Sequence, residues 1–294
     1  MDDDSPPRPR VRRVDERLGL AVLRAPLSAR TLVTYARDHV TVRTPSRPTF
    51  ADGNTLDLEA RPTPDELAGW MERFRSTTGQ LGAVRPQLRW EERAPSGREV
   101  TSTADPGLVA AATELGLVLH ARVVLLLEAL APVPMAPARL DPVEAPSAAP
   151  GGPVDRRWHA ATVLYRYEQQ ERGDHPKGWR DWDEDEVAWR VEVQRELALE
   201  GRARVWLAAR HGAPVGRVTL THDRQGLARI DDLVVHPVHR RRGIGAVLVH
   251  EAVAARLEVD PTARVGAVAA PASVGLRLAR RLGLRDHAVV WTAR

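Results

Sequence analysis

The sequence predicts an α/β protein made of two consecutive domains. Segments with helical spacing of apolar residues alternate with short segments rich in β-branched residues, as expected of a sheet covered by helices. The stretch over residues 131–154 is dominated by proline, alanine and glycine and has no periodic apolar face, so we expect a linker there. The length of 294 residues suits two domains of ordinary size.

Composition excludes several classes of protein. Cysteine is absent, which leaves no disulfide framework and no thiolate zinc site, and we expect no bound metal. The net charge of +4 is only weak evidence for a nucleic-acid partner, so we expect none. The sequence has no run of about eighteen apolar residues, so we expect no membrane span. The first residues lack the basic-then-apolar order of a signal peptide, so we expect a cytoplasmic protein.

The first half is predicted to be a flexible tail over residues 1–16 and a domain over residues 17–130. A capping box at Thr63 to Glu66, with a proline at the first helical position, predicts a helix start. The elements predicted in this half are a helix over 28–39, strands over 41–44 and up to 58, a helix over 63–78, a strand over 87–90, a helix over 106–115 and a strand over 117–127.

The second half, residues 155–294, is predicted to alternate more regularly. Acidic residues crowd the start of the helix over 184–199, as the helix dipole favours. The predicted elements are helices over 158–172 and 184–199, a hairpin over 204–221, a strand over 228–235, a helix over 245–257, a strand over 265–270, a helix over 272–282 and a strand over 287–292.

One stretch carries most of the chemical information. The strand ends before Pro237, the helix starts at Gly245, and between them stand Arg240-Arg-Arg-Gly243-Ile-Gly245. Glycines let the backbone turn sharply and approach a ligand, and the start of a helix offers unpaired N–H groups, so this turn is suited to phosphate. Three arginines add positive charge at its rim.

A strand, a proline and then Arg-x-x-Gly-x-Gly opening a helix resembles the acyl-CoA signature of the GCN5-related N-acetyltransferases (GNAT superfamily). The resemblance covers about residues 155–294 and implies a GNAT fold, with a mixed central sheet flanked by helices, and acetyl-CoA as co-substrate. It implies that the CoA site consists of Leu233, Val234, Val235, Arg240, Arg241, Arg242, Gly243, Ile244, Gly245 and Ala246. It also implies a β-bulge in the motif strand and a backbone donor for the acetyl carbonyl near Val235.

A short repeat links the two halves. Leu115-Gly-Leu-Val-Leu-His120-Ala and Leu282-Gly-Leu-Arg-Asp-His287-Ala match at five positions with one offset of 167 (282 − 115). We interpret this as a duplicated fold. Since the first half has no Arg-x-x-Gly-x-Gly motif, the whole resembles a tandem GNAT protein of actinobacterial type with a degenerate first copy that binds no CoA.

Direct transfer of an acetyl group to an amine needs a base, and Asp231 and Asp232 on the motif strand are the candidates. Successive strand side chains point to opposite faces, so we expect only one of them to face the acceptor, with a preference for Asp231. The alternative is a structural role for both, in ion pairs with nearby arginines.

The expected general acid is missing. Many family members carry an asparagine at the start of the helix after the fifth strand and a tyrosine four residues before its closing glycine. Those positions hold Ala272 and Ala279, and His287, Tyr165 and Tyr167 are the remaining candidates for protonating the thiolate.

The acceptor is expected to be a small-molecule or peptide amine. Trp179, Trp182 and Asp183 form part of an aromatic, acidic stretch that suits a cationic group. An acidic helix start is the alternative explanation of the carboxylates and is the more common one. The sequence leaves open a monomer or a homodimer. The main alternative function is a non-catalytic acyl-CoA-binding or regulatory module, and a nucleic-acid-binding protein is the third.

Overall fold

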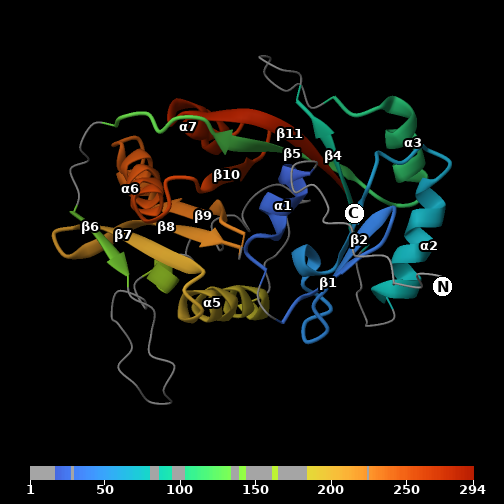
Figure 1. Cartoon of the computed structure of the whole chain (residues 1–294), viewed down its shortest axis with the longest axis horizontal. Coiled ribbons are helices and arrows are strands. Elements are labelled where there is room, and N and C mark those ends of the chain that lie inside the picture. Colours follow the sequence, from blue (N-terminus) through green and yellow to red (C-terminus); the bar gives the residue numbers. More distant parts are fainter. Residues whose placement is uncertain are drawn as a thin grey trace, which may run out of the picture.

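The computed structural model describes residues 17–27, 30–79, 86–94, 103–133, 139–143, 161–164, 184–223 and 225–294. Their strands form one mixed sheet in the order β1-β2-β3-β4-β11-β5-β10-β9-β8-β7-β6. Helices lie on both of its faces (Figure 1). This is the predicted fold class, with the two halves of the chain sharing a single sheet. None of the helices in these ranges is long and apolar enough to cross a membrane.

The N-terminal half supplies one side of the sheet. Its helices are α1 (Leu18–Arg24), α2 (Leu67–Thr77) and α3 (Pro106–Glu114), with a 3₁₀ turn η1 (Ala51–Gly53). Its strands are β1 (Leu32–Tyr35), β2 (His39–Arg43), β3 (Thr55–Leu58), β4 (Leu88–Arg93) and β5 (Leu119–Leu127). The predicted capping box is present in part, because the Glu66 carboxylate accepts the Thr63 amide at 2.8 Å.

The C-terminal half supplies the other side. Its helices are α5 (Glu184–Leu199), α6 (Ile244–Val259) and α7 (Val274–Arg281), with a 3₁₀ turn η3 (Pro237–His239). Its strands are β7 (Ala203–Arg210), β8 (Ala213–His222), β9 (Leu227–Val235), β10 (Arg264–Ala269) and β11 (Leu284–Ala293), with β6 (Arg139–Val143) at the edge. Every element predicted from residue 184 onward is confirmed within a few residues.

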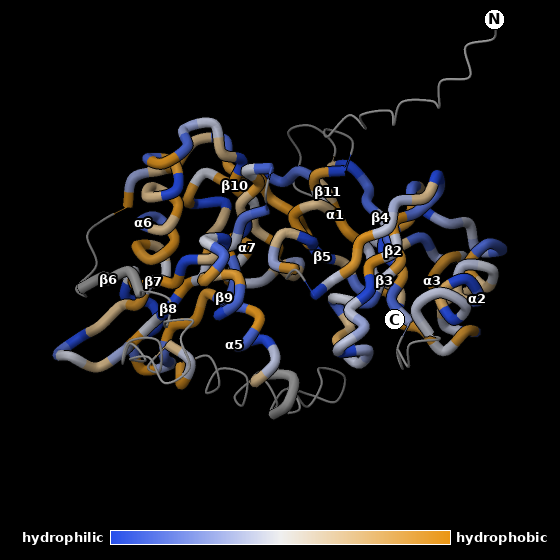
Figure 2. The backbone as a smooth tube through the Cα atoms, turned by 60° about the horizontal axis from the view of Figure 1, so that its bottom comes forward, coloured by the Kyte–Doolittle hydropathy of each residue, from blue (hydrophilic) through white to orange (hydrophobic). Residues whose placement is uncertain are grey.

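The two faces of the sheet differ in character. Val123 and Leu125 of β5 pack with α6 and α7, while Trp291 of β11 packs with α2 and α3. The opposite face carries α1, which packs on Val124 and Val290. Figure 2 shows hydrophobic stretches along the strands and along the helices that cover them. The α1 face also carries buried charged side chains: Asp57 and Arg89 are buried there, and Arg24 of α1 donates to the Asp57 carboxylate.

The halves are interleaved at the centre of the sheet. β11, from the end of the chain, pairs with both β4 and β5, and β5 pairs with β10. The register between β5 and β11 agrees with the repeat. Val123 of β5 pairs with Val289 of β11, and the equivalent residues in the other copy, Val290 (123 + 167) and Arg122 (289 − 167), also pair with each other. In both halves a parallel strand pair, a helix and a long strand follow one another.

The two glycines of the repeat differ in their surroundings, which gives a stability prediction. Gly116 and Gly283 both have a positive φ, at 72° and 93°. A Cβ on Gly283 would lie 1.8 Å from the Ala129 carbonyl oxygen, whereas a Cβ on Gly116 would meet nothing within 4 Å. We expect Gly116→Ala to lower the unfolding free energy by about 1 kcal/mol and Gly283→Ala by about 3 kcal/mol or more. Urea unfolding of the two variants measures the difference, and equal losses would contradict this view of the junction.

One prediction for the N-terminal half was wrong, and two further elements, one of them within the predicted linker, were not predicted. The segment predicted as a helix over 28–39 contains β1 and the start of β2, because Leu32-Val-Thr-Tyr35 is a strand-forming run that pairs with Val40 to Arg43. The helix α1 was not predicted. It is short, and it is held by a tertiary contact in which the Glu91 carboxylate accepts the Leu20 amide at 3.1 Å. The predicted linker contains β6, whose proline is tolerated at a sheet edge. The predicted tail over residues 1–16 lies outside the described residues.

Candidate active site

The turn between β9 and α6, which we call the anion site, is an open helix start of the kind that suits an anion. Gly243 is the N-cap of α6, with a left-handed φ of 79° and no side-chain cap. The first hydrogen bond of the helix runs from the Val247 amide to the Gly243 carbonyl at 3.1 Å, so the amides of residues 243–246 precede it. These amides and the positive end of the helix dipole lie at an open end of the helix, since Gly243 is exposed and a Cβ there would meet nothing within 4 Å.

The three arginines of the turn differ in role: one stabilises the turn, and two are exposed at its rim. Arg240 braces the turn, because its Nε donates to the Val235 carbonyl at 2.9 Å. Arg241 has a φ of 63° and, like Arg242, is exposed. Ile244 is 2 % exposed and packs in the core, so only its backbone is available to a ligand.

Next to this turn, β9 separates from β10. Their parallel pairing ends at Ile230 and Ala267, although both strands continue. A register shift between β8 and β9 falls at the same place, where Asp232 takes a left-handed φ of 46°. The strand pair therefore opens at the end where the anion site lies, and the expected bulge in the motif strand is present.

The opening leaves a backbone donor in the expected position. The His236 amide donates to the Val215 carbonyl of β8 at 2.9 Å. Because N–H groups of a strand alternate between its two edges, the Val235 amide points the other way, toward the separated β10. A donor at this position suits the oxygen of an acetyl group bound between the strands.

Apolar side chains line one side of the opening. A Cβ on Gly245 would lie 3.6 Å from Val235, 3.7 Å from Leu233 and 3.7 Å from Leu278 of α7. Glycine keeps this space free. Val234 is 3 % exposed and lies opposite Arg217 of β8, so it points to the other face and does not line the same surface.

Both aspartates lie on the face of β9 that α5 covers. The Asp231 carboxylate accepts the Thr221 hydroxyl at 3.1 Å and pairs with Arg229 at 2.7 Å. Asp232 accepts a short hydrogen bond from Gln194 of α5. The two side chains therefore do not point to opposite faces as expected, since the bulge interrupts the alternation between Asp231 and Asp232, and which of them faces the acceptor stays a prediction.

Burial gives Asp231 an unusual proton affinity. Its side chain is 12 % exposed, and desolvation together with the negative charge of Asp232 raises its pKa to about 6 from the ordinary 3.8, against the opposing attraction of Arg229. A carboxylate with a pKa near 6 is ionised at neutral pH and still basic enough to accept a proton.

A buried network holds the second aspartate in place. Gln194 links Asp232 to Arg217, whose guanidinium donates to the Gln194 side-chain oxygen and to the Thr219 hydroxyl, both at 2.8 Å. Arg217 is 2 % exposed and also donates to the Ala161 carbonyl at 2.9 Å. Sequence reasoning did not identify Gln194, Arg217 or Arg229, because their roles depend on contacts between distant segments.

The structure places some of the remaining candidate residues, and the others lie outside the described residues. Ala279 is buried on α7 at 8 % exposure, and Ala272 is exposed before that helix. His287 lies on β11, two strands beyond β10, beside Glu91, so the structure separates it from the motif strand. Tyr165, Tyr167, Trp179, Trp182 and Asp183 lie outside the described residues.

Comparisons with known proteins agree with this geometry. Residues 164–272 match the family model of the acetyltransferase (GNAT) family. A GCN5-related N-acetyltransferase from Kribbella flavida aligns over 94 % of both chains with a TM-score of 0.57 and 17 % identity. A functionally unknown conserved protein from Staphylococcus epidermidis aligns over 88 % of this chain and 91 % of its own, with a TM-score of 0.62 and 14 % identity. No curated protein gives a significant match. At these identities the two structures show the fold alone, and the family match adds that residues 164–272, in the C-terminal half, are similar to the acetyltransferase (GNAT) family.

Proposed function

We propose that this protein is an acetyl-CoA-dependent N-acetyltransferase that moves the acetyl group to a primary amine by direct attack. The proposal rests mainly on three features that lie together along β9. An uncapped helix start suited to pyrophosphate, an opening between β9 and β10, and a carboxylate with a pKa of about 6 lie along one strand.

In this proposal the CoA pyrophosphate binds to the amides of residues 243–246, with Arg241 and Arg242 at the rim. The pantetheine arm lies along Leu233 and Val235 in the space that Gly245 keeps free. The Val235 amide binds the acetyl oxygen and stabilises the negative charge that develops there.

Asp231 is the proposed base. It takes a proton from the ammonium group, directly or through one water, so that the neutral nitrogen attacks the acetyl carbon. A carbon–nitrogen bond forms and the carbon–sulfur bond breaks. The attacking nitrogen gives up its second proton to water, and the departing thiolate takes a proton from water, since Ala272 and Ala279 provide no acidic side chain. Asp232, held by Gln194, contributes negative charge beside Asp231.

The N-terminal half is proposed to bind no CoA. Its counterpart of the anion site is the start of α2, where Pro64, Asp65 and Glu66 stand in place of the glycines. The Glu66 carboxylate already accepts the Thr63 amide there. A negative charge at this helix start repels a pyrophosphate.

Free-thiol release from acetyl-CoA, measured over a panel of primary amines with mass spectrometry of the product, tests the activity. Release that depends on the amine and gives a product heavier by one acetyl group supports the proposal. The alanines at the expected acid positions favour a second candidate, a non-catalytic acyl-CoA-binding module. That candidate predicts acetyl-CoA binding with no amine-dependent release, and absence of binding would contradict both.

A further inference from the structure

A cluster of charged residues joins the two halves on the α1 face of the sheet. Arg122 of β5, Arg190 of α5 and Arg229 of β9 gather around Asp52 of η1, and we refer to these four residues as the arginine cluster. Asp52 pairs with Arg190 at 3.1 Å and lies 3.9 Å from Arg122. The surrounding guanidinium groups hold the pKa of Asp52 well below its usual range. Arg229 also pairs with Asp231 at 2.7 Å, so the three guanidinium groups face two carboxylates and positive charge is in excess.

Arg122 is the least satisfied member. Its only partner in the described part of the chain is Asp52, at a distance too long for a hydrogen bond, although a guanidinium has five N–H donors. Its side chain is 34 % exposed, so a solute can reach it. Desolvation of the covered part of its side chain and the like charges of Arg229, Arg89 and Arg190 lower its pKa against the attraction of Asp52, which means that the site disfavours the bare cation.

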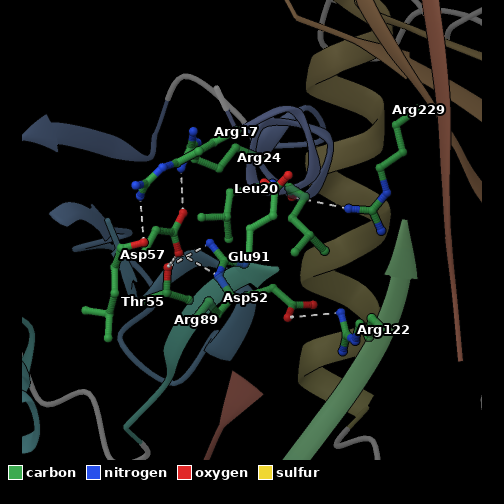
Figure 3. Close-up of polar contacts among 12 residues, drawn as sticks. Arg17, Leu20, Arg24, Asp52, Thr55, Asp57, Arg89, Glu91, Arg122 and Arg229 are labelled. Carbon is green, nitrogen blue, oxygen red and sulfur yellow. Dashed lines mark hydrogen bonds and ion pairs between the residues drawn. The ribbon is translucent and has the colours of Figure 1, made fainter. Parts of the chain in front are cut away.

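A neighbouring site shows how the same face satisfies arginines that serve structure. The Asp57 carboxylate accepts Arg89 Nε and Arg24 Nη1, both at 2.6 Å, and Arg89 also donates to the Thr55 hydroxyl. Figure 3 shows this compact arrangement beside the looser pair of Asp52 and Arg122. Donors held in place without hydrogen-bond partners are typical of a site that binds an anion.

The sheet register places Arg122 and the proposed base on the same face and at the same end of the sheet. Val124 pairs with Val268 of β10, on the same face as Arg122. Extending the pairing of Ile230 with Ala267 by one residue brings Asp231 level with Val268. Arg122 therefore lies two strands across from Asp231, about 10 Å, and two residues further along, about 7 Å. It is at the end of the sheet where β9 and β10 have separated.

We infer that the acceptor amine also carries an anionic group, a carboxylate or a phosphate, and that Arg122 binds this group. The inference rests on the proposed function. It makes the N-terminal half part of the acceptor site, because Arg122 and Asp52 both come from that half, while the base and the CoA site come from the other half. Asp52 orients Arg122 through its charge and is a positioning residue.

Matched pairs of amines test the inference. Free-thiol release is measured with O-phosphoethanolamine against ethanolamine, and with lysine and glutamate against their decarboxylated amines, cadaverine and 4-aminobutyrate. We expect a higher kcat/KM for the member with the additional anionic group in at least one pair, and the phosphate and carboxylate pairs tell the two chemistries apart. In Arg122→Gln, KM for that member should rise by about 10- to 100-fold, with Arg122→Lys in between.

A binding measurement gives a result even without turnover. The same compounds are titrated into protein saturated with CoA, so that the pyrophosphate site is filled. Anion-dependent binding that Arg122→Gln weakens by about tenfold or more supports the inference. Equal binding within every pair, or equal affinity in the variant, would overturn it. An unchanged acetyl-CoA affinity in Arg122→Gln would show that the CoA site of the variant is intact. A wild-type protein that does not bind acetyl-CoA would count against the proposed function rather than against the role of Arg122.

Arg285→Gln is the matched control. Arg285 lies on β11, the strand paired with β5, and its 69 % exposed side chain pairs with Glu128. Loss of this surface charge should change neither KM nor anion binding. The same drop in both variants would assign the effect of Arg122 to overall charge and contradict a specific site.

Discussion

Replacing Asp231 with asparagine is expected to lower kcat for acetyl transfer by about 10²- to 10⁴-fold, the usual contribution of a general base. Asparagine keeps the size of the side chain and can still accept the Thr221 hydroxyl, but it cannot take a proton. Steady-state free-thiol release measures the loss. Because Asp231 does not contact the proposed CoA site, the affinity for acetyl-CoA should stay within about threefold of the wild type.

The pH profile separates a base from a structural aspartate. With its pKa raised to about 6, Asp231 is protonated and inactive below that pH and active above it, so kcat/KM of the wild type should rise with pH through about 6. The residual activity of Asp231→Asn should lack this rise. A variant that retains the same acidic limb would show that another group is the base.

The contribution of Asp231 to the free energy of unfolding should fall with rising pH, whereas its contribution to activity should rise. The pKa of folded Asp231 lies above the ordinary 3.8, so its ionisation opposes folding. The contribution of this group to stability is intact below about pH 4 and falls as pH rises toward 6, by up to about 3 kcal/mol, since a tenfold change in proton affinity corresponds to about 1.4 kcal/mol. Asp231→Asn should therefore be no less stable than the wild type at pH 8 in urea unfolding.

The neighbouring aspartate provides the matched control. Asp232 adopts a φ of 46°, a conformation that asparagine also tolerates, so Asp232→Asn should preserve the bulge. We expect its kcat to fall less than about tenfold, since it acts on Asp231 only through charge. A larger loss of kcat in Asp232→Asn than in Asp231→Asn would show that Asp232 is the base and that Asp231 acts only through its charge.

Replacing Gly243 with glutamate is expected to raise the Kd for acetyl-CoA more than about 100-fold, since like charges brought together cost several kcal/mol. Nothing within 4 Å hinders a side chain there, so the carboxylate can stand in front of the open amides without disturbing the core. Calorimetric titration of acetyl-CoA into the variant measures the loss.

Backbone strain needs its own control, because Gly243 has a φ of 79°. Gly201 has a φ of 72° and equally open surroundings, and it lies in the turn before β7, at the other end of the sheet from the β9–α6 turn. Gly201→Glu adds the same charge at a similar conformational cost of about 1 kcal/mol. It should bind acetyl-CoA as the wild type does. Weakened binding in both variants would assign the effect to strain or net charge rather than to the anion site.

Local signals in the sequence were sufficient for much of the C-terminal half. The strand, the glycine turn and the helix around Gly243 are fixed by residues close together in the chain, and they appear as predicted. The same holds for α3, where Asp105 caps the helix before Pro106 and its carboxylate accepts the Leu108 amide. Such signals act over one or two turns and do not depend on distant partners.

Features that depend on distant partners could not be predicted. The repeat indicated two copies but not the exchange at the centre, where β11 lies between β4 and β5. A bulge was expected, but not that it falls at Asp232 and interrupts the alternation of side chains there. The raised pKa of Asp231 comes from its burial in the folded chain and from the charge of Asp232. Arg122 was read as one residue of a strand. Only the pairing of β5 with β10 brings it to the open end of β9.

The most direct test of the account is calorimetric titration of acetyl-CoA into the wild-type protein. One open anion site at α6, and a helix start at α2 already occupied by Glu66, predict one acetyl-CoA bound per chain. Binding with this stoichiometry would support a single catalytic unit completed by the N-terminal half. Two molecules per chain would contradict the assignment of the first copy, and absence of binding would contradict the proposed activity itself.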